Sequence, residues 1–163
     1  MKKILVIINF IVLVLTLDLY AQEISSENYK STPETKKFEG TWGFNSGSIK
    51  LILKLENHEK FYIKSTQTYA DVIQGSVLYI KNGKVIYQNE NAIIHGRTGS
   101  SMPFELWAIF QDPNGTGGRL ILTFLNHNDI NSLNLKLVQR NHLDPSKHPP
   151  LKIPQEIILK REK

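Results

Sequence analysis

The segment from Asp112 to Gly117 has the residue types that could begin a calcium-binding loop. It reads Asp-Pro-Asn-Gly-Thr-Gly, with oxygen-bearing side chains at alternate positions and glycine at the sixth. Such a loop needs a carboxylate at its twelfth position that binds calcium through both oxygens, and that position is Thr123, inside a predicted strand. Because the same residues favour tight turns, we predict a hairpin turn here and no metal site.

The five histidines do not have the spacing of a zinc site. None are four residues apart on a predicted helix, and there is no His-Glu-x-x-His motif. His142 and His148 flank a loop that contains Asp144, which could attract a metal, but solvated loop side chains explain this pattern equally simply. The chain has no cysteine, which excludes a disulfide, a thiolate ligand and a thiol nucleophile. We expect neither a metal nor another cofactor.

No group of residues argues for catalysis. Gly99-Ser100-Ser101 lacks the Gly-x-Ser-x-Gly sequence and the strand-turn-helix context that expose a serine nucleophile. The acidic residues are not paired, and most of those in the folded part lie at predicted strand ends or turns, where aspartate favours turn geometry whatever the function. We therefore expect no catalytic residue and a protein that is not an enzyme.

The N-terminus has the pattern of a signal peptide. Lys2 and Lys3 precede an apolar run over residues 4–17, which is shorter than the roughly 20 residues that span a membrane. Ala21, followed by Gln22, offers the small residue that cleavage requires. We expect residues 1–21 to be removed on export to the periplasm or the medium, with no membrane span afterwards; the alternative is an uncleaved anchor.

Two further segments follow. Residues 22–37 are polar and contain Pro33, so we expect a disordered leader. Residues 38–163 have the length of one domain. The net charge is +5, but lysines and arginines alternate with apolar residues instead of forming a basic stripe, which argues against nucleic-acid binding.

Alternating apolar and polar residues predict about nine short strands and no helix in this domain. Residues 49–56 show the pattern clearly, with Ile49, Leu51, Leu53 and Leu55 on one face. Further strands are predicted near residues 61–64, 76–81, 84–88, 93–94, 104–110, 119–126, 132–139 and 156–161. The pattern predicts an all-β fold: a single antiparallel, meandering barrel of about 8–10 strands, with a β-sandwich as the alternative.

Asn82-Gly83 predicts a two-residue hairpin turn, with Lys81 opposite Lys84. Counting outward from this turn puts four apolar residues on the predicted core face: Leu78, Ile80, Val85 and Tyr87. The opposite face then carries Val77, Tyr79 and Ile86. The proline-rich segment 144–154 cannot lie inside a sheet, so residues 156–161 are expected to form a last, edge strand.

Several predicted strands are apolar on both faces, namely residues 77–80, 106–109 and 120–122. In a barrel, one of those faces points outward. The C-terminal tail, the leader or a second copy of the chain could cover it, and otherwise it would be a binding surface.

Gly40-Thr41-Trp42 resembles the Gly-x-Trp motif at the start of lipocalins and related calycin barrels. That resemblance implies a lipocalin-like barrel whose tryptophan closes one end and is covered by an arginine from the last strand. Arg161 is in phase with inward-facing Ile157 and Leu159, whereas Arg140 is predicted to point outward. We therefore predict a closure formed by Gly40, Trp42 and Arg161, with the guanidinium within about 6 Å of the indole ring.

A broader pattern covers nearly the whole exported chain. It combines Ala21-Gln22, the Gly-x-Trp motif, Tyr69-x-Asp71 leading to Gly75, the hairpin of residues 79–84 and the closing Ile153-Pro154. In this it is similar to an uncharacterised family of small exported proteins from Bacteroidota. The resemblance implies bacterial export and a barrel, and it brings no known activity or catalytic residue.

These observations favour a non-catalytic binding module for a small apolar ligand or a protein partner. The alternative is a structural or interaction protein with a filled core and no ligand. The candidate ligand-binding residues are aromatic: Trp42, Phe61, Tyr87, Phe104 and Trp107. The ligand, the partner and the oligomeric state stay open.

Overall fold

The computed structural model describes residues 29–99, 101–111, 117–139 and 153–162, without the side chains of residues 89–93. These ranges contain nine strands and one short 3-10 helix. The elements are β1 (Tyr29–Lys30), η2 (Pro33–Phe38), β2 (Gly40–Ser46), β3 (Ile49–Ile63), β4 (Thr68–Lys81), β5 (Lys84–Gly99), β6 (Met102–Gln111), β7 (Gly117–Asn126), β8 (Asp129–Gln139) and β9 (Glu156–Arg161). No helix in the described ranges is both long enough and apolar enough to cross a membrane.

Strands β2 to β9 form a closed antiparallel barrel. Each strand pairs with its neighbours in sequence, and β9 also pairs with β2, which closes an eight-stranded meander. The predicted barrel is confirmed, and because the sheet closes, the sandwich alternative does not apply. The short β1 lies outside the barrel and pairs in parallel with β4.

The last strand is not an edge strand, so that prediction was wrong. Leu159 of β9 pairs with Leu133 of β8, while Arg161 pairs with Trp42 of β2. The strands β2 and β8 would otherwise each present a row of unpaired backbone groups, and β9 satisfies both. Most of the proline-rich segment 144–154 lies outside the described residues.

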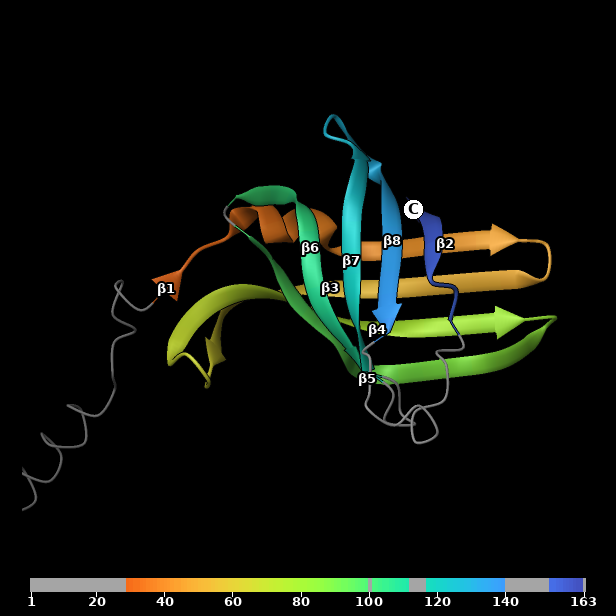
Figure 1. Ribbon diagram of the computed structural model, residues 1–163, viewed down its shortest axis with the longest axis horizontal. Coiled ribbons are helices and arrows are strands. Elements are labelled where there is room, and N and C mark those ends of the chain that lie inside the picture. The colour runs from red at the N-terminus through yellow and green to blue at the C-terminus, as the bar shows by residue number, and fades with distance from the viewer. Residues whose placement is uncertain (1–28, 100, 112–116, 140–152, 163) are drawn as a thin grey trace, which may run out of the picture.

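Strand β5 joins the two halves of the barrel. Its first part, from Lys84, pairs with β4, and its last part, to Gly99, pairs with β6. Figure 1 shows the consequence: β2, β3 and β4 run lengthwise, β5 changes direction, and β6, β7 and β8 run across the first group. The side chains between the two groups form the core.

The turn prediction is confirmed, but of the four residues predicted from it to face the core only Tyr87 does so. Asn82 and Gly83 have φ angles of 53° and 72°, and Lys81 pairs with Lys84. The register then shifts by one residue, so Tyr79 pairs with Tyr87 instead of Ile86. This β-bulge brings Tyr87 onto the same face as Val77 and Tyr79, which lie beside Leu53 and Leu51 of β3 in the core, whereas Val85 is exposed.

The leader prediction was wrong for its second half. Of residues 22–37, the described part includes β1 and most of η2. Thr35 of η2 is buried and its hydroxyl lies 2.9 Å from that of Thr98 on β5. Polar composition suggested a segment with nothing to bury, but here side-chain hydrogen bonds fasten the segment to the barrel.

A single cluster of 21 buried apolar side chains occupies the interior of the described barrel. It includes the alternating residues predicted from the sequence, such as Leu51, Leu53 and Leu55 on β3 and Leu133, Leu135 and Leu137 on β8. Phe38 from η2 also belongs to it, so the helix closes one end of the barrel with an apolar side chain.

Candidate functional site

The barrel end beneath η2 is closed by three aromatic rings. Phe38 and Trp42 are both fully buried, and the indole N–H of Trp42 donates a hydrogen bond of 2.9 Å to the carbonyl of Phe38. The Phe124 ring from β7 lies 4.6 Å from that of Phe38 and 6.2 Å from that of Trp42, between ring centroids. Rings from η2, β2 and β7 therefore exclude water from this end.

Arg161 covers the closed end from outside. Its guanidinium carbon lies 4.2 Å from the centre of the Trp42 ring, within the distance predicted from the strand phase. It also donates hydrogen bonds to the carbonyls of Glu39 at 2.6 Å, Lys37 at 2.8 Å and Ile130 at 3.3 Å. Arg140 lies outside the described residues.

Gly40 has no side chain to obstruct this arginine. Its φ of 128° is rarely adopted by other residues, and a Cβ atom there would lie 2.7 Å from Nη1 of Arg161. The contacts of Gly40, Trp42 and Arg161 explain why the three residue types occur together. In this structure the three residues together form the closed end of the barrel.

We expect Arg161→Ala to lower the free energy of unfolding by about 2 kcal/mol, because it removes three charge-assisted hydrogen bonds and the contact with Trp42. Urea unfolding followed by circular dichroism measures this. Arg119→Ala is a matched control, since Arg119 also lies over a tryptophan, Trp107, at 4.9 Å but donates no comparable hydrogen bonds to the described residues. It should change stability by less than about 0.5 kcal/mol. Equal losses in the two variants would contradict a special role for Arg161.

The five aromatic residues predicted to bind a ligand do not share a pocket. Trp42 and Tyr87 belong to the buried core. Phe61 lies beside the His95 ring at 5.1 Å, and Phe104 stacks on the His127 ring at 3.9 Å. Burial, together with the nearby His58, lowers the pKa of His95. Trp107 points outward from β6, with 41% of its surface exposed.

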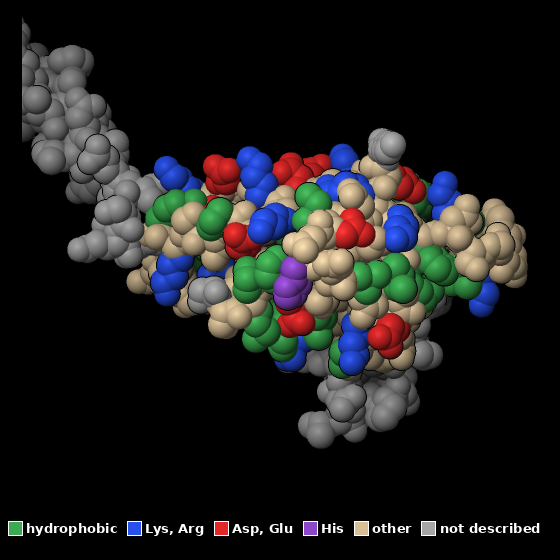
Figure 2. Space-filling view, turned by 90° about the horizontal axis from the view of Figure 1, so that it is seen from above, with side chains coloured by type: hydrophobic (Ala, Val, Ile, Leu, Met, Phe, Trp, Pro, Cys, Tyr) green, Lys and Arg blue, Asp and Glu red, His purple; other side chains and the backbone are tan. Residues whose placement is uncertain are grey.

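Trp107 is the centre of an exposed apolar surface on the outside of β6, β7 and β8. Two neighbouring rows of outward-facing residues cross these strands. In the first row Trp107 lies opposite Ile121. In the second row Ile109 lies opposite Arg119, and Arg119 lies opposite Val138. Ile109 is 69% exposed and Val138 is 45% exposed. We call these five residues the Trp107 face. Figure 2 shows that hydrophobic side chains also gather in patches between charged ones on the side seen from above.

A hollow of about 570 Å³ lies on this face. It is lined by Trp107, Ala108, Ile109, Gly117, Gly118, Arg119, Val138 and Gln139. The indole N–H of Trp107 donates a hydrogen bond to the Glu105 carboxylate, which fixes the orientation of the ring. With Arg119 over that ring, the hollow combines an apolar wall with a positive charge.

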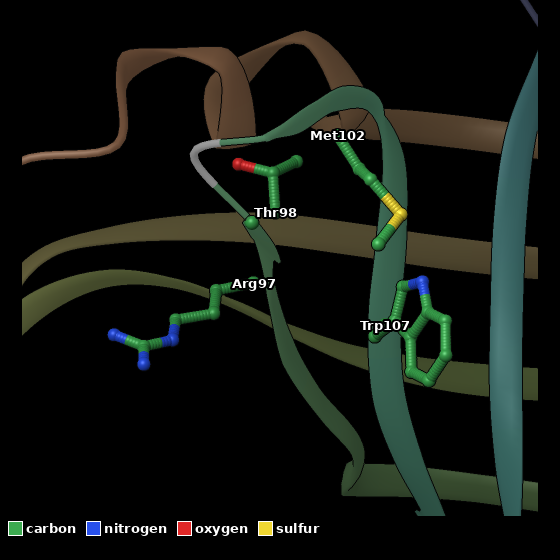
Figure 3. A pocket seen from close by; sticks show the side chains of 5 residues that line it. Arg97, Thr98, Met102 and Trp107 are labelled. Carbon is green, nitrogen blue, oxygen red and sulfur yellow. The ribbon is translucent and has the colours of Figure 1, made fainter.

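A second hollow, of about 330 Å³, is also bounded by Trp107. Its other lining residues are Arg97, Thr98, Gly99 and Met102. Figure 3 shows the Met102 side chain extending toward the indole, whereas the guanidinium of Arg97 points away from it. Trp107 thus borders two hollows and has a different arginine beside each.

The sequence singled out Trp107 but not its neighbours Ile109, Arg119 and Val138. A signal for Ile109 was present in residues 106–109, which are apolar on both faces, but Arg119 and Val138 lie outside the segments with that pattern. The pattern within one strand does not show the register of β6, β7 and β8, and it is this register that brings Trp107, Arg119 and Val138 together.

Asp71 forms a buried polar centre that sequence reasoning did not assign. Only 4% of the residue is exposed, and its carboxylate accepts hydrogen bonds from the Tyr29 hydroxyl at 2.6 Å and the Thr32 amide at 2.8 Å. The Ser31 hydroxyl and the Lys60 amide also donate to it, each at 3.3 Å. Burial alone would raise the pKa of Asp71, but these hydrogen bonds outweigh it and lower the pKa.

This carboxylate fastens β1 and the start of η2 to the barrel and satisfies a bulge in β3. Among the described residues, four hydrogen-bond donors of the protein itself surround the carboxylate, which is the arrangement of a structural anchor. Within the described ranges, no three histidine, cysteine, aspartate or glutamate side chains group as metal ligands would.

Comparison with known proteins identifies a family without an assigned function. No curated protein and no solved structure matches the chain. A family model described as "Family of unknown function (DUF6705)" matches residues 1–95, a range that includes Gly40, Trp42 and Asp71 but not Trp107 or Arg161. As the match covers more than half of the 163 residues, the chain belongs to the DUF6705 family.

Proposed function

We propose that the protein is an exported, non-catalytic binding module that uses the Trp107 face to hold its ligand or partner. The observation that carries this proposal is the large exposure of Trp107, Ile109 and Val138 around one hollow. A tryptophan and an isoleucine exposed side by side are unfavourable in water, and such surfaces commonly mark interaction sites. The hollow also has the volume usual for ligand sites.

The interior is a weaker candidate for binding. Lipocalin-like barrels hold ligands inside, and the Trp42–Arg161 contact supports a barrel of that type. Here, however, the described interior holds one continuous cluster of large side chains, including Phe38, Trp42 and Phe110. Binding on the outer face requires no rearrangement of that cluster.

Export is the second part of the proposal. It is supported by the signal-like residues 1–21 and by the similarity to small exported Bacteroidota proteins. The absence of cysteine means that the barrel reaches its fold without disulfides in an oxidising compartment. The exported protein should begin at Gln22, which its intact mass determines.

Native mass spectrometry of protein purified from the exporting cell tests the binding function. We expect the wild type to carry a bound species that Trp107→Ala loses. Leu125→Ala is the control, because Leu125 is 51% exposed but does not line the hollow. If wild type and Trp107→Ala carry the same species, or if neither carries one, the proposal is wrong, and the alternative of a filled structural protein without a ligand gains support.

A further inference from the structure

We infer that the Trp107 face binds an amphipathic organic anion, whose acidic head pairs with Arg119 and whose apolar body lies along Trp107, Ile109 and Val138. This inference rests on the function proposed above and names the chemical class of the ligand. It depends on three observations: the charge that lines the hollow, the availability of that charge, and the shape of the surface.

The charge of the hollow is positive. Arg119 is the one ionisable side chain among its described lining residues, and the other side chains are apolar or carry a neutral amide. A protein with a net charge of +5 adds a favourable background for an anion. An uncharged apolar ligand would leave this guanidinium partly desolvated without a compensating partner.

The Arg119 guanidinium is available. In the described part of the chain it forms no ion pair, and it lies over the face of the Trp107 ring. Glu105 is the acidic residue on the same face, but its carboxylate already accepts hydrogen bonds from the Trp107 indole and, at 3.4 Å, from the Thr123 hydroxyl. A guanidinium stacked on an indole keeps its edge free to bind both oxygens of a carboxylate.

The shape of the surface favours a small ligand over a membrane. Proteins that lie on lipid bilayers insert protruding apolar side chains, whereas this face is hollowed by about 570 Å³ between Trp107 and Val138. A hollow of this size accepts an alkyl or aryl body, with the exposed sides of Ile109 and Val138 as its walls.

Decanoate and decanol, used as monomers, test the inference because they share an apolar chain and differ in charge. Binding can be followed by the change in fluorescence emission of Trp107, because the other tryptophan, Trp42, is fully buried and does not contact a ligand on the Trp107 face. Decanoate should bind about tenfold more tightly than decanol to the wild type. Arg119→Gln should remove this preference and leave decanol binding unchanged. Arg97→Gln is the matched control and should keep the preference, because Arg97 points away from Trp107 (Figure 3).

The outcomes separate the inference from the proposed function. Suppose that decanoate and decanol bind the wild type equally well and that calorimetry detects no binding of either to Trp107→Ala. This result would overturn the anion preference but would still support the Trp107 face as the binding surface. Binding that survives Trp107→Ala would overturn both. If neither probe binds, or if the protein binds only phosphatidylglycerol vesicles, the inference is wrong, while native mass spectrometry still decides the proposed function.

Discussion

Trp42→Ala is expected to lower the free energy of unfolding by about 3 to 5 kcal/mol. Trp42 is fully buried and touches the ring of Phe124, while its indole N–H satisfies the carbonyl of Phe38. Truncation would leave a large cavity at the closed end and an unsatisfied carbonyl. It would also remove the surface that Arg161 covers. Urea unfolding monitored by far-ultraviolet circular dichroism, which follows mainly the backbone of the sheet and needs no tryptophan fluorescence, measures the loss.

The second tryptophan supplies the matched control. Trp107 is 41% exposed, so Trp107→Ala should cost less than about 1 kcal/mol. The same chemical change at two positions thus separates a residue that holds the barrel together from one that is available for binding. A loss of stability at position 107 as large as that at position 42 would mean that the Trp107 face is part of the folding core.

The parts of this fold that the sequence predicted are those in which one strand carries its own signal. Period-two alternation over residues 49–56 identified the inward face of β3, and Asn82-Gly83 identified a hairpin turn. The Gly-x-Trp motif and the phase of Arg161 led to the closed end. Each depends on residues close together in sequence or on a simple alternation.

The parts that failed depend on what lies across the sheet. The bulge at Ile86 moves Tyr87 onto the same face as Tyr79, and nothing in the alternation marks it. The position of β9 between β8 and β2 follows from closure of the whole barrel, not from its own six residues. The Trp107 face likewise exists only after three strands are placed in register.

The N-terminal segment shows the same limit for polar residues. Residues 22–37 have the composition of a disordered leader, but the described part, residues 29–37, is held by partners more than 30 residues away. The part of β4 that precedes Ile73 does not pair with β5. On this free edge of β4, β1 pairs with Tyr69 and Ala70. Asp71 lies next to this pairing and supplies the acceptor for three hydrogen-bond donors of the segment.

Asp71→Ala should therefore lower the free energy of unfolding by about 2 to 3 kcal/mol at neutral pH, because the four hydrogen-bond donors around this buried carboxylate lose a charged acceptor. Amide hydrogen exchange should show the larger effect in β1 and η2, since these elements depend on the carboxylate. Asp129→Ala is the control: the Asp129 carboxylate also accepts a backbone hydrogen bond, from Asn131 at 2.9 Å, but Asp129 is the first residue of β8 and is less buried than Asp71. It should cost less than about 1 kcal/mol.

The contribution of Asp71 should also depend on pH with a defined sign. Its pKa in the folded protein lies below the ordinary value of 3.8, so the folded state binds this proton less readily than the unfolded state. The stabilisation is then fully present above the unfolded pKa and disappears as the pH falls through the lower, folded pKa. Urea titrations of wild type and Asp71→Ala at a series of pH values should give a stability difference that is constant near neutrality and shrinks below pH 3.8. A difference that stays constant into the acid range would show that Asp71 stabilises the segment by packing alone and not as a charged acceptor.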